Sequence, residues 1–339
     1  MTVAVPDQSG MPTAGDGSCL LDVRDLNINF RSGAGDVFAV QHVSFSLHPN
    51  ETLGLVGESG CGKSTTAMAV MGLLPPNARA RGEVEFEGNN LLTMGEKDLR
   101  ELRGDRISMV FQNPMTSLDP SYTVGSQIVD VLREHRSLSR DDAEETAIAL
   151  LRQVRIDAPE QRFNTYPHHL SGGMRQRVVI AIALACNPAL LIADEPTTAL
   201  DVTIQAQILN LLRDLRVERQ TSIILITHDL GVVAQMADRV AVMYAGRIVE
   251  EGPVADVFET PLHPYTAALM RSIPSPEVGR GKLAVIEGTV PNLREPARAC
   301  PFAPRCPHRM ERCTQRVPVL TEVRANHKVA CFLHEDVHE

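Results

Sequence analysis

The stretch that decides the fold is Gly57-Glu58-Ser59-Gly60-Cys61-Gly62-Lys63-Ser64, which fits the pattern G-x-x-x-x-G-K-[ST]. The apolar run 53–56 before it is typical of a buried strand, and 65–74 is typical of a helix. Glycines let the backbone wrap closely around phosphate oxygens, and the helix N-terminus adds partial positive charge. The stretch predicts a phosphate-binding loop, with Lys63 on the β- and γ-phosphates of a nucleotide and Ser64 on Mg²⁺. The predicted nucleotide contacts in this loop are Gly57, Ser59, Gly60, Cys61, Gly62, Lys63, Ser64 and Thr65.

Two further motifs follow the loop in order. The run Leu-Ser-Gly-Gly-Met-Arg-Gln-Arg over 170–177 opens a predicted helix, which Asn187-Pro188 stops. The apolar run 190–193 then ends in Asp194-Glu195. Because a predicted strand ends there, the Asp194 carboxylate can reach Mg²⁺ through water. A solvated acidic pair at a strand end is the alternative interpretation.

In this order, the phosphate loop, the Leu-Ser-Gly-Gly motif and the acidic pair resemble the ATPase subunits of ABC transporters. The resemblance implies that Glu195 is the general base for ATP hydrolysis. It implies that Gln112, in the segment 110–114, is the Q-loop glutamine, which joins Mg²⁺ or the attacking water to the surface facing a membrane subunit. His228, after the predicted strand 222–227, would contact the γ-phosphate.

The same resemblance implies two ATPase domains with two ATP molecules between them. The motif residues Ser171, Gly172 and Gly173 would close on the ATP of a partner subunit. Asp201, in the D-loop segment Thr198–Asp201, would lie at the interface; the segment begins with Thr where the family often has Ser. One aromatic side chain upstream of the loop stacks on adenine in this family. Phe30 is the candidate here and Phe38 the alternative, and core packing is the competing interpretation for both.

The resemblance implies an α/β fold, with a RecA-like P-loop core, an antiparallel β-subdomain and an α-helical subdomain. The alternation of apolar and polar residues over 43–47 and 84–87 favours the β-subdomain. We expect the ATPase domain over 19–260, with the helical subdomain at about 113–170 and a small Cys-rich C-terminal appendage over 261–339. The chain contains no internal repeat, which favours one ATPase domain rather than a fused pair.

Composition restricts the location and the partners of the chain. Lys and Arg number 33 and Asp and Glu 42, so the net charge of −9 argues against a nucleic-acid partner. No apolar run approaches the roughly 18 residues that span a bilayer. Residues 1–18 are rich in Gly, Pro, Ser and Thr and contain no Lys or Arg, so we expect a disordered tail rather than a signal peptide. We expect a peripheral protein on the cytoplasmic face of the membrane, with transport through other polypeptides.

Four of the seven cysteines lie near the C-terminus, in the pattern Cys300-x5-Cys306-x6-Cys313-x17-Cys331. The cytosol does not favour a disulfide framework, which leaves metal as the next interpretation. The spacing lacks the short knuckles that are typical of zinc sites, and proline follows Cys300 and Cys306, as in ferredoxin runs. The pattern favours a [4Fe–4S] cluster; Zn²⁺ and unmetallated thiols are the alternatives.

His263-Pro264-Tyr265, the cysteine tail and the segment Gln112–Pro120 together resemble the ATPases of dipeptide and oligopeptide importers, whose relatives move nickel and glutathione. The resemblance implies two transmembrane permease subunits and an extracytoplasmic peptide-binding protein. It also implies a second ATPase subunit, either a different chain or an identical one. Import of nickel or another small solute is the alternative function. A soluble ABC ATPase outside transport is a further alternative, although the chain has no second ATPase domain or long coiled coil.

Overall fold

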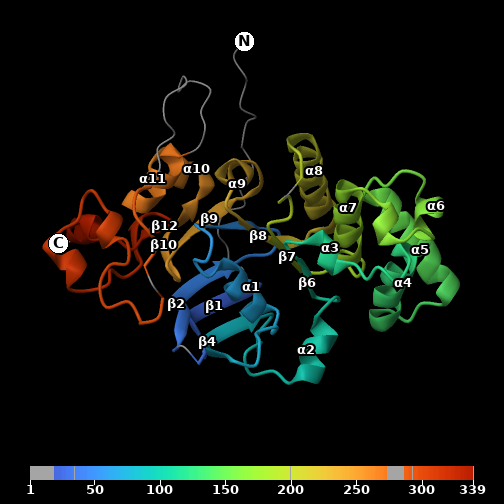
Figure 1. The fold of residues 1–339 in the computed structure, drawn as a ribbon, viewed down its shortest axis with the longest axis horizontal. Helices are drawn as coiled ribbons and strands as arrows, with labels where there is room; N and C mark the ends of the chain where they lie inside the picture. The colour runs from blue at the N-terminus through green and yellow to red at the C-terminus, as the bar shows by residue number, and fades with distance from the viewer. Residues whose placement is uncertain (1–18, 34, 199, 273–285, 292, 339) are drawn as a thin grey trace, which may run out of the picture.

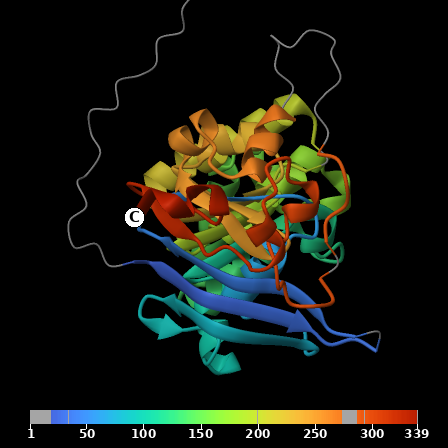
Figure 2. The same ribbon diagram turned by 90° about the vertical axis from the view of Figure 1, so that its left-hand side faces the viewer.

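The computed structural model describes residues 19–33, 35–198, 200–272, 286–291 and 293–338. The predicted disordered tail over 1–18 lies outside these ranges. Within them the chain forms a four-stranded sheet in the order β2-β1-β4-β5 and an eight-stranded sheet in the order β11-β12-β10-β9-β3-β8-β7-β6. Figures 1 and 2 show the smaller sheet below the larger one.

The smaller sheet is the predicted antiparallel β-subdomain. It contains β1 (Leu21–Phe30), β2 (Val37–Leu47), β4 (Ala78–Phe86) and β5 (Asn89–Asn90), and each neighbouring pair is antiparallel. Alternate residues of β2 are buried from Val43 to the end of the strand, because successive side chains point to opposite faces. The alternation in the sequence therefore predicted this sheet correctly.

The larger sheet is built around five parallel strands. They are β3 (Thr52–Val56), β6 (Ile107–Val110), β7 (Leu190–Asp194), β8 (Ser222–Thr227) and β9 (Arg239–Tyr244). Every residue of β3, β6, β7 and β8 is buried, as expected for parallel strands that are covered on both faces. Because the carboxyl ends of parallel strands meet at one edge, this arrangement brings the ends of β3, β6, β7 and β8 together.

The C-terminal region extends this sheet rather than standing apart as an appendage. The hairpin of β9 and β10 (Arg247–Pro253) continues into β12 (His327–Val329) and β11 (Thr321–Arg324), all antiparallel. The Glu250 side chain, which is fully buried, lies 2.8 Å from Nε2 of the equally buried His327. Because a buried carboxylate needs polar partners, this contact fixes β12 against β10.

Eleven helices in the described residues surround the sheets. The bounds outside the helical subdomain are α1 (Lys63–Val70), α2 (Glu96–Leu102), α8 (Val202–Arg219), α9 (Leu230–Met236), α10 (Val254–Glu259) and α11 (Pro264–Arg271). The helix after the phosphate loop starts two residues earlier than the predicted 65–74 and ends earlier, at Val70, because the chain turns at Gly72, whose φ is 62°. None of the described helices combines the length and the apolarity that crossing a bilayer requires.

The helical subdomain lies to the right of the sheet in Figure 1. Its helices are α3 (Pro114–Ser117), α4 (Val124–His135), α5 (Arg140–Gln153), α6 (Pro159–Phe163) and α7 (Gly172–Ala183). Ser139 caps α5 by accepting a hydrogen bond from the backbone N–H of Asp142. One apolar cluster joins α4, α5 and α7 to α8 and to the central strands, so the subdomain is packed firmly on the core.

Candidate ATP site

The phosphate loop connects β3 to α1, and its shape depends on glycine at two positions. Gly57 has φ 153° and Gly62 has φ 105°. A Cβ atom on Gly57 would lie 2.1 Å from the carbonyl oxygen of Met243, and one on Gly62 would lie 2.5 Å from that of Ala39. Any larger residue would therefore force the loop away from the neighbouring strands, so glycine is required here.

Lys63, the lysine of the motif, is held inside the loop. Its Nζ atom donates to the carbonyl oxygens of Gly57 at 2.8 Å and Glu58 at 3.1 Å, and the residue is 6% exposed. An ammonium group can donate three hydrogen bonds. These two hydrogen bonds hold the Lys63 ammonium against the backbone of the loop. The loop also ends on the first turn of α1, whose free N–H groups favour an anion.

Ser64 and Asp194 form a pair of oxygen ligands suited to Mg²⁺. Ser64 hydrogen-bonds to the Asp194 carboxylate, which is buried at the end of β7. Burial raises the pKa of Asp194, with the nearby Glu195 charge adding to the effect and the Ser64 bond opposing it. Among the described residues, the Oδ1 atom of Asp194 is buried without a hydrogen-bond partner. A divalent cation would satisfy this oxygen and stabilise its charge, so the site fits Mg²⁺.

The Glu195 carboxylate is the meeting point of the other predicted catalytic residues. Its Oε2 atom accepts hydrogen bonds from Gln112 Nε2 at 2.7 Å and Thr198 Oγ1 at 2.8 Å. Its Oε1 atom lies 3.1 Å from Nδ1 of His228. Gln112, Glu195 and His228 follow the neighbouring strands β6, β7 and β8, and the sheet therefore brings together residues that lie far apart in the sequence.

These contacts favour the ionised form of the Glu195 carboxylate. Burial acts to raise the pKa of its carboxyl, but the hydrogen bonds from Thr198, His228 and Gln112 outweigh burial and hold the pKa below the usual value. The side chain is 16% exposed, so water can still reach it. The backbone of Glu195 lies in the left-handed region at φ 47°, where its N–H donates to the carbonyl of Ile226. An unfavourable backbone angle held by neighbouring structure is common at functional sites.

Thr198 is a contact of this carboxylate that the sequence did not predict. The sequence placed Thr198 only in the D-loop segment. Its position three residues after Glu195, across a turn closed by the Thr198 N–H and the Glu195 carbonyl, was the available signal.

The Leu-Ser-Gly-Gly motif and Asp201 lie outside this set of contacts to Glu195. Ser171 caps α7 by accepting from the N–H of Met174, and both Ser171 and Gly172 are exposed. Gly173 packs closely on Ile204, and Asp201 caps α8. Figure 1 shows α7 and α8 beside each other and away from α1. The exposed start of α7 therefore faces outward, where it is accessible to another molecule.

The two aromatic candidates for adenine stacking are both half-buried. Phe30 ends β1 and pairs with Val37 of β2, and its side chain packs against the apolar cluster that the two sheets share. Phe38 lies one residue farther along β2, and its N–H donates to the carbonyl of Leu293 at 2.7 Å. Phe30 and Phe38 therefore both remain candidates for stacking on adenine.

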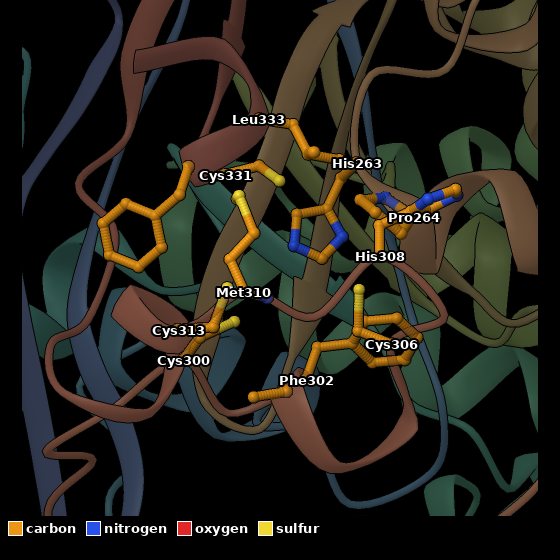
Figure 3. Close-up of a pocket in the computed structure, with 12 residues that line it drawn as sticks. His263, Pro264, Cys300, Phe302, Cys306, His308, Met310, Cys313, Cys331 and Leu333 are labelled. Atoms are coloured by element: carbon orange, nitrogen blue, oxygen red, sulfur yellow. Dashed lines mark hydrogen bonds between the residues drawn. The ribbon is translucent and has the colours of Figure 1, made fainter. Parts of the chain in front are cut away.

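The four C-terminal cysteines line one small pocket. The pocket also contains the side chains of His263, Phe302 and Met310, and Figure 3 shows the His263 ring in the middle of this view with Cys306 to one side and Cys331 to the other. Burial raises the pKa of the Cys300 and Cys306 thiols and raises that of Cys331 to about 11. In the part of the chain that the structure describes, no three His, Cys, Asp or Glu side chains are arranged to hold one metal ion. The described residues therefore show no site arranged for a single metal ion such as Zn²⁺.

Known proteins are similar to this chain over the segments that form the site and its surroundings. A family described as "ABC transporter" matches residues 40–198, from β2 through the phosphate loop to Thr198. A second family, described as "Oligopeptide/dipeptide transporter, C-terminal region", matches residues 249–313, which include Glu250, His263 and three of the cysteines. The dimeric ATP-binding cassette MJ0796 with ADP and phosphate bound has a similar fold, with a TM-score of 0.63 and 28% identity. The similarity covers 69% of this chain and 98% of the cassette.

Two curated relatives match along nearly the whole chain. A probable peptide ABC transporter ATP-binding protein of Sinorhizobium fredii is 54% identical over 94% of this chain and 96% of its own length. The dipeptide transport ATP-binding protein of Bacillus subtilis is 49% identical over 93% of this chain and 95% of its own length. The chain therefore belongs to the family of ABC-transporter ATPase subunits that serve dipeptide and oligopeptide import.

Proposed function

We propose that this chain hydrolyses ATP to drive the import of dipeptides or oligopeptides across the cytoplasmic membrane. The observation that carries the ATPase is the convergence of Gln112, Thr198 and His228 on the Glu195 carboxylate, at the edge of the sheet where the phosphate loop also begins. The peptide cargo is supported by the match of residues 249–313 and by the names of the relatives.

The roles of the residues follow from their chemistry. Lys63 and His228 bind the γ-phosphate, and Glu195 takes a proton from the attacking water. Ser64, Gln112 and Asp194 hold Mg²⁺, which when bound neutralises developing phosphate charge. Because Glu195 already carries hydrogen bonds to Gln112 and His228, these two residues orient the base before ATP arrives. Phe30 stacks on adenine.

The exposed start of α7 supplies the second half of the site. Ser171, Gly172 and Gly173 bind the ATP of a second ATPase subunit, and Asp201 lies at that interface. Two transmembrane permeases and an extracytoplasmic peptide-binding protein complete the importer. The chain is peripheral, on the cytoplasmic face of the membrane.

The test is transport in cells that lack this gene. Wild-type chain restores peptide uptake, whereas Glu195→Gln binds ATP but loses hydrolysis by about 100-fold or more and restores no uptake. Nickel uptake is measured in the same cells. Restoration of nickel uptake without peptide uptake would contradict the proposed cargo, and wild-type turnover by Glu195→Gln would contradict the assignment of the base.

We also propose that Cys300, Cys306, Cys313 and Cys331 ligate a [4Fe–4S] cluster, with Zn²⁺ as the alternative. The support is that the four side chains line one pocket of the C-terminal region and that their spacing lacks zinc knuckles. Such a cluster would stabilise this region. Iron and acid-labile sulfide near four each per chain, after purification without oxygen, are expected; about one zinc and no iron would contradict the cluster.

A further inference from the structure

The C-terminal region contacts the phosphate loop at Glu58. Arg305, in a short 3₁₀ segment (Ala303–Arg305), places its Nη1 atom 3.1 Å from each oxygen of the Glu58 carboxylate. The Arg305 side chain is 5% exposed and that of Glu58 is 27% exposed. Because the pair is largely shielded from water, its attraction is screened less than that of a surface ion pair.

The guanidinium of Arg305 is fixed in place by other contacts. Its Nε donates to the carbonyl of Glu287 at 3.0 Å, and its Nη2 donates to the carbonyl of Ile286 at 2.9 Å. Its Nη1 also lies 3.3 Å from Oη of Tyr244 in β9. Since all three nitrogens are engaged, the arginine presents its charge to Glu58 in one orientation, with little conformational entropy left to lose.

Tyr265 holds the same residue from a second direction. Its Oη accepts a hydrogen bond from the Glu58 backbone N–H at 3.0 Å. The Tyr265 ring is fully buried, with its centroid 4.6 Å from that of Tyr244 and 5.5 Å from that of Phe302. A hydroxyl on a ring packed this firmly is a rigid acceptor, so it fixes the path of the loop backbone.

Glu58 thus joins the C-terminal region to the phosphate-binding lysine. Its N–H is bound by Tyr265 and its carboxylate by Arg305, and its carbonyl accepts from Nζ of Lys63 at 3.1 Å. A carboxylate within the loop would repel a triphosphate if its charge were left unpaired. Arg305 removes this repulsion at the position where the loop must curve around the phosphates.

We infer that Arg305 and Tyr265 are positioning residues for the phosphate loop, and that through Glu58 they set the affinity for ATP. The inference rests on the proposed ATP-binding role of the loop. It assigns the C-terminal region a direct part in nucleotide binding, in addition to any metal it holds. Neither residue reaches the proposed base Glu195 through a described contact, so the effect falls on binding rather than on the hydrolytic step.

The test measures the dissociation constant for MgATP, and KM and kcat for hydrolysis, on the full chain. Arg305→Gln weakens ATP binding and raises KM by about tenfold while kcat stays within about twofold, because one largely buried ion pair is lost. Arg305→Lys retains the charge and recovers part of the affinity. Arg309→Gln, an exposed arginine of the same region, serves as the matched control and binds ATP like wild type.

A double substitution separates the charge of Glu58 from a general loss of structure. Glu58→Gln combined with Arg305→Gln removes both charges, and ATP affinity returns to within about threefold of wild type. If the double variant binds as weakly as Arg305→Gln, or if Arg305→Gln binds like wild type, the inference is wrong.

If Arg305→Gln does not fold, Tyr265→Phe serves as a second variant that tests the inference. It removes one oxygen and leaves the Glu58 N–H without its acceptor, so ATP affinity falls by about fivefold. Unchanged affinity in Tyr265→Phe would overturn the part assigned to this hydroxyl. Failure of the wild-type chain to bind MgATP would instead contradict the proposed function itself.

Discussion

At the scale of single residues, the site depends on how one carboxylate is surrounded. Glu195 receives hydrogen bonds from Gln112 and Thr198 and lies beside His228. These groups hold the pKa of the carboxyl low in spite of burial. The proposed base is therefore ionised at neutral pH and keeps a fixed orientation, and a general base must be ionised and oriented to accept a proton from water.

Substitution of Thr198 tests whether its hydroxyl lowers the pKa of Glu195. Thr198→Val removes one hydrogen bond to the ionised carboxylate, so the pKa of Glu195 rises. The acidic limb of the pH profile of kcat then moves to higher pH by up to about one unit, since the base must be deprotonated to act. Thr198→Ser retains the hydroxyl and keeps the wild-type profile. Superimposable profiles for Thr198→Val and wild type would show that the hydroxyl does not tune the base.

At the scale of elements, α11 is anchored by a buried histidine. The Nδ1 atom of His263 accepts from the N–H of Tyr265 at 3.0 Å and so caps the helix. The backbone N–H of His263 donates to the Glu250 carboxylate at 2.9 Å. Burial lowers the pKa of the His263 imidazole to about 4, although the nearby Glu250 charge acts in the opposite direction. The ring thus stays neutral in the folded chain while it titrates normally in the unfolded chain.

The pH dependence of stability follows from this difference. Between about pH 6.5 and pH 4 the unfolded chain binds a proton on His263 that the folded chain does not, so stability is lost as the pH falls through that window. The loss amounts to at most roughly 3 kcal/mol. His263→Asn keeps a capping oxygen but cannot titrate, so its unfolding free energy in urea falls less on acidification.

The exposed His168 offers a matched comparison for this prediction. His168→Asn is expected to follow the wild-type dependence, because this exposed substitution leaves His263 and its buried surroundings unchanged. Parallel curves for His263→Asn and wild type between pH 6.5 and pH 4 would contradict a role for the buried imidazole.

At the scale of the whole molecule, the parts that the sequence predicted are those whose chemistry fixes both residue type and spacing. Lys63 and Glu195 follow apolar strands in recognisable patterns, and β-sheet alternation identified β2. The pairing of β12 with β10 was not predicted, because it joins segments separated by a long stretch of chain without a shared pattern. The contact of Arg305 with Glu58 has no signal in the sequence for the same reason: only the folded sheet brings the two together.

The position of β11 at one end of the eight-stranded sheet has a consequence for solubility. An edge strand presents unpaired backbone groups that invite another chain to add a strand, which leads to aggregation. The edge strand β11 has the sequence Thr-Glu-Val-Arg. Three of its four residues are exposed, including the oppositely charged Glu322 and Arg324. Charged side chains on a short strand oppose such additions. The C-terminal segment thereby opposes self-association at this edge of the sheet.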